Sequence, residues 1–162
     1  RIRQAMPDCA ITTDIIAGFC GETEQDHQDT LDIMRRVKYD YAYMFQYSER
    51  PGTLAARKYP DDIEPQEKTR RLNEIIALQN ELSLESNKKD VGKVLTVLVE
   101  GTSKRSDKEL CGRASNNKMC VFPAELAEAS EPTAPGRYHV GDYVKVEVLS
   151  CTSATLICKI AE

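Results

Sequence analysis

The sequence predicts an α/β segment followed by a small all-β barrel. Two observations carry this prediction: apolar residues change from helical to alternate spacing near residue 90, and five short β-type runs follow that point. Charge changes there as well. Residues 1–90 hold 13 basic and 17 acidic side chains, a net −4, whereas residues 91–162 hold 9 of each. We therefore predict two domains, 1–90 and 91–162.

The first part of the chain is predicted to form a β–α–β unit. Residues 10–19 are rich in Ile and Thr, with the consecutive apolar positions of a strand covered on both faces. Thr23 suits the N-cap of a helix, and residues 27–37 carry apolar side chains at helical spacing. Residues 41–47 are predicted to form an aromatic second strand, parallel to the first and joined to it by a right-handed crossover. Because such a pair needs neighbouring strands, we expect the chain to be a fragment of a longer protein.

A polar loop and a long helix complete the predicted first domain. The loop covers residues 48–64 and contains Pro51-Gly52. Pro65 suits the first turn of a helix, and apolar side chains at spacings of three and four extend this helix to about Lys89.

The second domain is predicted to be a barrel. Gly, Asn and Asp residues separate its strands, as turns require. Five short strands in so few residues are typical of a closed barrel of the oligonucleotide/oligosaccharide-binding (OB) kind, which we expect to be antiparallel. Residues 123–137, rich in Ala, Glu and Pro, are expected to form a mobile loop. The strands are expected at 94–99, 109–114, 119–122, 143–149 and 155–160.

Composition excludes several classes of protein. A hydrophobic content of 41% argues against global disorder, and a net charge of −4 argues against a globally basic nucleic-acid binder. No apolar run reaches the roughly 18–20 residues of a membrane span, and no signal segment is present. We therefore expect a cytoplasmic protein with no membrane partner.

The cysteine spacing points to no metal site. No two of the six cysteines have zinc-ligand spacing, and both histidines lie far from any cysteine pair. A chain of this size with no secretory signal does not need disulfides. We expect buried free thiols that pack as small hydrophobes at Cys9, Cys20, Cys111, Cys120, Cys151 and Cys158.

Two polar clusters follow the two predicted strands. Asp14, Gly18 and Glu22 surround the end of the first, where glycines admit a flat ligand and carboxylates bind hydroxyl or amino groups. Ser48 and Arg50 follow the second, where they are suited to bind a carboxylate or a ribose. The alternative is structural, since capped turns and Pro-Gly loops have the same composition.

A basic run lies in the predicted barrel. Residues 101–120 hold five basic and two acidic side chains inside a neutral domain. On a small barrel, such a run indicates contact with a nucleic-acid backbone; the alternatives are a solvated face and, for the two asparagines, a turn. The candidate RNA-binding residues are Lys104, Arg105, Lys108, Arg113, Asn116, Asn117 and Lys118.

Three sequence strings carry a resemblance to a known family. TDIIAGFCGETEQD, FQYSERPGT and VLVEGTSKRSDKELCGRASNNKMCVFP together resemble the methylthiotransferases of the radical S-adenosylmethionine (SAM) superfamily. The resemblance covers nearly the whole chain. It implies that residues 1–90 are the end of a radical SAM partial TIM-type barrel with its trailing helix. It also implies that residues 91–162 are a TRAM domain, an OB-like RNA-binding barrel.

The motifs favour one branch of this family. Arg50-Pro51-Gly52 and the run from Gly112 to Pro123 resemble the branch that methylthiolates the N6-isopentenyl-type adenosine next to the anticodon of tRNA. The branch that modifies a ribosomal protein usually has an acidic residue in place of Arg50. The branch that acts on threonylcarbamoyladenosine shares the Arg-Pro-Gly motif and stays an alternative. An RNA-binding module without catalysis is another.

The resemblance also implies cofactors and partners. The family cleaves SAM at one 4Fe–4S cluster to a radical that abstracts hydrogen from the substrate, and a second 4Fe–4S cluster carries the sulfur. The CxxxCxxC motif and the further cluster cysteines are absent from this chain, so the fragment is expected to be inactive alone, and no catalytic residue is assigned. The implied partners are a tRNA anticodon stem-loop and an electron donor to the clusters, and the protein is expected to be a monomer. The residues implied to line the SAM or target-base pocket are Asp14, Ile16, Gly18, Glu22, Gln46, Ser48 and Arg50.

Overall fold

The computed structural model describes residues 1–124 and 138–161 and divides the chain into two compact units. One unit comprises residues 11–83. The other comprises residues 1–10 and 84–162, so the division falls inside a long helix. The predicted loop at 123–137 lies, from residue 125 onward, outside the described residues.

The unit of residues 11–83 contains the predicted β–α–β arrangement. Strands β1 (Thr12–Ala17) and β2 (Tyr41–Gln46) are parallel, and helix α2 (Glu24–Val37) connects them. Thr23 caps α2 as predicted, because its hydroxyl accepts from the Asp26 backbone N–H while the Asp26 carboxylate accepts from the Thr23 N–H. Helix α4 (Pro65–Lys88) matches the predicted long helix. The short helix α3 (Leu54–Lys58) lies where only a loop was predicted.

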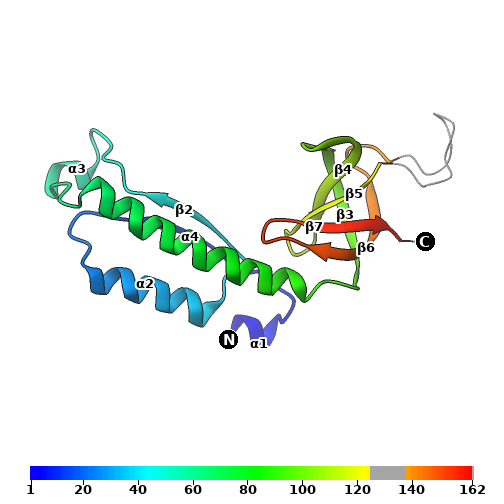
Figure 1. The fold of residues 1–162 in the computed structure, drawn as a ribbon, viewed down its shortest axis with the longest axis horizontal. Helices are drawn as coiled ribbons and strands as arrows, with labels where there is room; N and C mark the ends of the chain where they lie inside the picture. The colour runs from blue at the N-terminus through cyan, green and yellow to red at the C-terminus, as the bar shows by residue number, and fades with distance from the viewer. Residues whose placement is uncertain (125–137, 162) are drawn as a thin grey trace. The chain divides into compact units, whose positions relative to one another are not determined.

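Helices α2 and α4 cover one face of the two-stranded sheet (Figure 1). The core holds Ile15, Ala17 and Ala42 from the strands against side chains of both helices, among them Met34 and Ile75. Strand residues of the other parity are exposed: Ile16 to 55%, Tyr43 to 54% and Phe45 to 57%. The expectation of a strand covered on both faces is therefore wrong for this chain, because no described element of its unit packs on the second face.

The second unit contains the predicted five-stranded closed barrel (Figure 1). Its order is β3-β4-β5-β7-β6, and four of the five strand pairs are antiparallel. The fifth pair, β5 with β7, is parallel, so the expectation of an entirely antiparallel barrel is wrong at the closure. The strands are β3 (Val94–Ser103), β4 (Ser106–Ala114), β5 (Met119–Pro123), β6 (Tyr143–Cys151) and β7 (Leu156–Ile160).

Alternate residues of the barrel strands point inward and form one core. Phe122 is the largest of the fully buried side chains, and the valines of β3 and β6 pack around it. Gly112 is needed where β3 and β4 approach, because a Cβ at this residue would lie 2.0 Å from the carbonyl oxygen of Leu98. The short helix α1 (Ile2–Ala5), which was not predicted, precedes the first unit and buries no side chain.

All six cysteines are free thiols, but only Cys120 and Cys158 are buried. The expectation of buried thiols is therefore wrong for Cys9, which is exposed, and for the three cysteines of intermediate exposure. Within residues 1–124 and 138–161, no three His, Cys, Asp or Glu side chains gather as a metal site would require. Across the same residues, no helix has both the length and the apolar character of a membrane span.

Candidate functional site

A pocket of about 400 Å³ lies at the ends of β1 and β2. Just after β2, the Tyr47 N–H donates to the Ala17 carbonyl at 2.8 Å, and a turn at Pro51-Gly52 follows. The structure therefore gathers four predicted residues in one pocket: Ile16, Gln46, Ser48 and Arg50. Its full lining is Ile16, Phe45, Gln46, Tyr47, Ser48, Arg50, Thr53 and Ala55.

The pocket combines an apolar floor with polar groups at its side. Ile16 and Phe45 are cross-strand partners on the exposed face of the sheet, and they offer flat apolar area to a planar ring. Ser48 and Arg50 supply a hydroxyl and a guanidinium beside this surface. Asp14 lies on the same face, two residues before Ile16 and opposite Tyr43. The set is suited to a ligand with one aromatic and one anionic part.

Glu22 and Gly18 are held by contacts within the loop that follows β1. The Gly18 N–H donates to Glu22 Oε2 at 2.7 Å, and Arg71 donates to the same oxygen at 2.7 Å. Gly18 has φ +74°, and a Cβ there would lie 2.4 Å from Cγ of Lys68. The aliphatic part of the Lys68 side chain thus lies where a Cβ of residue 18 would be. The Glu22 carboxylate orders the turn.

Sequence reasoning missed the helix side chains that hold these loops. Lys68 is 5% exposed; its ammonium binds Asp61 Oδ2 at 2.6 Å and lies 5.2 Å from the centre of the Tyr47 ring. Asp62 accepts from the Gly21 N–H at 2.7 Å. The polar run that contains both aspartates was interpreted only as a loop. Its pairing with helix α4 is the feature that spacing along the chain does not reveal.

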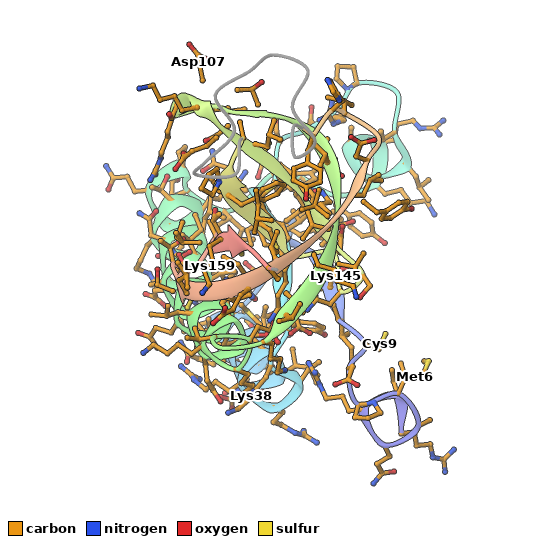
Figure 2. All side chains as sticks on the ribbon, turned by 90° about the vertical axis from the view of Figure 1, so that its right-hand side faces the viewer. Met6, Cys9, Lys38, Asp107, Lys145 and Lys159 are labelled. Carbon is orange, nitrogen blue, oxygen red and sulfur yellow. The ribbon has the colours of Figure 1, made fainter. Side chains whose placement is uncertain are left out.

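The predicted RNA-binding residues divide between the two ends of strand β4. Lys104 and Arg105 form the exposed β3–β4 turn, with exposed Lys108 just inside β4. Asp107, labelled in Figure 2, marks this end of the barrel. Arg113 lies near the other end of β4, and the three remaining candidates follow it. Eight steps of about 3.3 Å put the two ends of β4 roughly 26 Å apart, so the run is not one patch.

Lys118 and Asn116 are engaged with Asp90. Lys118 is 12% exposed, and its ammonium binds Asp90 Oδ2 at 2.7 Å and the Ser86 carbonyl at 2.9 Å. Asn116 donates to the same carboxylate oxygen at 3.3 Å. Burial acts to raise the pKa of Asp90, but the ammonium groups of Lys118 and Lys93 outweigh it and hold that pKa below its ordinary value. These contacts fasten the end of α4 to the barrel within one unit.

Comparison with known proteins identifies the barrel and gives relatives for nearly the whole chain. Residues 88–160 match the TRAM domain family. The chain is 50% identical over 155 residues to a tRNA-2-methylthio-N(6)-dimethylallyladenosine synthase of Phocaeicola vulgatus, a match that covers 96% of this chain and 32% of that protein.

Two further relatives carry the same name. The protein of Amoebophilus asiaticus is 54% identical over 153 residues, 94% of this chain and 29% of its own length. The protein of Porphyromonas gingivalis is 47% identical over 161 residues, 99% of this chain and 32% of its own length. The chain thus spans about a third of the curated relatives that it matches. A solved multidomain protein with nucleic acid binding domains from Streptococcus pneumoniae covers 48% of this chain at 13% identity and a TM-score of 0.31, which is too low a likeness to carry an argument.

Proposed function

We propose that this chain is the C-terminal, TRAM-containing part of a tRNA-2-methylthio-N(6)-dimethylallyladenosine synthase. In the part that it spans, the chain belongs to the family of these enzymes. In this proposal the enzyme methylthiolates an N6-isopentenyl-type adenosine next to the anticodon of tRNA, and it acts in the cytoplasm as a monomer. The observation that carries the proposal is the convergence of Ile16, Gln46, Ser48 and Arg50 on one pocket in a chain about half identical to these enzymes.

Residues 11–83 are proposed to be the closing segment of a radical SAM barrel. In a TIM-type barrel, helices cover the outside of parallel strands and the other strand face lines the interior. Both features are present in part: β1 and β2 are parallel, their helices cover one face, and the other face exposes Ile16, Tyr43 and Phe45. Strands from the remainder of the enzyme would cover that face.

The strand-end pocket is proposed to bind SAM. Ile16 and Phe45 would hold the adenine ring, and Gln46, Ser48 and Arg50 would bind its polar groups or those of the target nucleoside. Asp14 is positioned to take part from the same face, while Gly18 and Glu22 would shape the loop beside it. SAM supplies the radical and the methyl group when bound. Both 4Fe–4S clusters and the site of the electron donor would lie in parts of the enzyme outside this chain.

The barrel is proposed to bind the anticodon stem-loop through its exposed basic side chains. Lys104, Arg105 and Lys108 form no ion pair with the described residues, so their charges are available to phosphates. Arg113 and Asn117 contact one another at the far end of β4 and would bind sugar or phosphate there. Asn116 and Lys118 would keep the adjoining turn in place.

Replacement of both Lys104 and Arg105 by alanine tests this RNA surface. Each lost phosphate contact removes about 0.7–0.9 from the slope of log affinity against log salt, so the slope should become shallower by about 1.4–1.8. The loss should be similar for stem-loops of different sequence, because backbone contacts carry no sequence information. Fluorescence anisotropy of a labelled stem-loop bound to the 162-residue chain, followed from about 50 to about 200 mM salt, measures both quantities.

Lys88 and Lys89 provide a control, since they are also adjacent, exposed and basic; Lys88 ends α4, and Lys89 follows it and lies 3.8 Å from Glu85. Their double alanine variant should keep the wild-type slope. If the wild-type chain binds the stem-loop but the Lys104/Arg105 variant keeps affinity and slope, the β3–β4 turn is only a solvated surface. If the wild-type chain does not bind the stem-loop, the proposed role of the barrel is wrong.

A further inference from the structure

Three outward-facing side chains form a row across the barrel. Tyr143, the first residue of β6, is paired with Leu98 of β3, and Leu98 is paired in turn with Arg113 of β4. Paired residues lie about 5 Å apart across a sheet, so Tyr143 and Arg113 flank Leu98 at roughly 10 Å from each other. All three belong to the barrel unit, and their row faces away from its core.

The tyrosine of this row is presented to solvent. Tyr143 is 72% exposed, and its ring makes none of the ring–ring contacts found among the described residues, which involve Phe19, Tyr41 and their partners. An aromatic side chain this exposed contributes little to the barrel core. It instead offers a rigid flat surface where β6 begins, on the outer face of the sheet.

Two basic side chains lie near the ring, one along β6 and one across the sheet beyond Leu98. Lys145, labelled in Figure 2, is the next outward-facing residue of β6, about 7 Å along the strand from Tyr143. It forms no ion pair with the part of the chain that the structure describes, whereas its neighbour Glu147 is paired with Lys159 at 2.9 Å. Across the sheet, Arg113 donates to the Asn117 carbonyl at 3.0 Å, and its Nε lies 3.5 Å from Glu100 Oε2, so a phosphate would share this guanidinium with Glu100.

We propose that Tyr143 stacks on an unpaired RNA base while Lys145 and Arg113 bind the adjoining phosphates. An exposed ring with cations near it matches the base and the backbone of a single strand, since every base has a flat π-face and every linkage carries a negative charge. The inference rests on the proposed function, because it assigns the part of the barrel that contacts the loop of a stem-loop rather than its paired stem.

The absence of tryptophan from the chain gives a direct test. The sequence contains no Trp, so Tyr143→Trp introduces a single tryptophan fluorophore at the proposed stacking surface. Addition of an anticodon stem-loop should quench its fluorescence, and a fully paired hairpin stem with a short inert linker should quench it much less. Ile157→Trp is the matched control: Ile157 is 38% exposed on the same barrel but pairs with Val121 of β5, and the fluorescence of this variant should stay unchanged.

Affinity measurements separate stacking from charge. Tyr143→Ala should weaken stem-loop binding by about fivefold or more with an unchanged salt slope, and Tyr143→Phe should bind like the wild type, because stacking uses the ring and not the hydroxyl. If the wild-type chain binds the stem-loop while Tyr143→Ala binds equally well and the fluorescence of Tyr143→Trp is not quenched, this inference is wrong and the proposed function stands. If the wild-type chain binds no RNA, the proposed role of the barrel is wrong, and the inference about Tyr143 is wrong with it.

Discussion

Replacement of Asp90 by alanine is expected to lower the free energy of unfolding of the barrel unit by about 3 kcal/mol. Asp90 is 8% exposed at its side chain, and its carboxylate binds Lys118, Lys93 and Asn116. Without it, the Lys118 ammonium stays in a site that is 12% exposed, with only the Ser86 carbonyl as partner. Removing one member of such a pair is costly because the other charge is left uncompensated.

Hydrogen exchange of the amides in the barrel strands measures this change, because the slowest of them report the global opening of the unit. Lys93→Ala is the control. Lys93 is 53% exposed and pairs with the same carboxylate, so its loss should cost less than about 1 kcal/mol. Equal opening free energies in Asp90→Ala and in the wild type would show that the end of α4 is not fastened to the barrel by this pair.

The effect of Asp90 depends on pH in a defined direction. Its pKa in the folded chain lies below the ordinary value of 3.8. A carboxyl group with a lowered folded pKa stabilises the folded state above its unfolded pKa, and this contribution is lost as pH falls through the folded value. The difference in the free energy of unfolding between the wild type and Asp90→Ala should therefore be largest at neutral pH and decrease below pH 3.8.

If the chain is part of a methylthiotransferase as proposed, the second large effect is expected at Arg50 in the intact enzyme. Arg50 lies on the exposed loop after β2 and lines the strand-end pocket, so its replacement by alanine should leave the fold unchanged. Loss of one charge-assisted hydrogen bond to substrate or SAM corresponds to about 1.5–3 kcal/mol, which is a decrease of roughly 10- to 150-fold in kcat/KM. Steady-state methylthiolation of tRNA with purified, cluster-loaded enzyme measures this decrease.

Arg36→Ala is a suitable control, because Arg36 is exposed on α2 and lies outside the pocket. The two variants change the net charge equally, so a general electrostatic effect on tRNA binding would lower both activities. We expect wild-type kcat/KM for Arg36→Ala and a decreased kcat/KM for Arg50→Ala. Wild-type activity in Arg50→Ala would show that Arg50 does not bind substrate or SAM in the pocket.

Local patterns predicted most of the secondary structure, because each element carries its own signal. Thr23 and Asp26 form the capping box at the start of α2, and Pro65 begins α4 where it was expected. Alternation placed all five barrel strands; β3, β4, β5 and β6 are longer than predicted by one to four residues, and β7 begins one residue later than predicted. The parallel β5–β7 closure was missed, since alternation gives the face of a residue but not the direction of its neighbouring strand.

The candidate site was harder to predict because its contacts join distant residues. Arg71 binds Glu22 across 49 positions, and Lys118 binds Asp90 across 28. A count of charges along residues 101–120 does not distinguish a cation held in an ion pair from an exposed one. Tyr143 did have a signal in the sequence, since the alternation of residues 143–148 places it on the outer face with Lys145. That pattern does not give the exposed fraction of the side chain, which is what distinguishes Tyr143 as a candidate binding residue.

A chimeric enzyme tests the central claim most directly. The segment of the Phocaeicola vulgatus synthase that aligns with this chain would be replaced by these 162 residues, and the chimera would be expressed in a bacterium that lacks its own synthase. Mass spectrometry of nucleosides from its tRNA would then measure the methylthio group. If this chain is the C-terminal part of such an enzyme, 2-methylthio-N6-dimethylallyladenosine should appear, and Arg50→Ala should reduce it. A chimera that is folded, binds both clusters and binds tRNA, yet leaves only the unmodified N6-dimethylallyladenosine, would contradict the account.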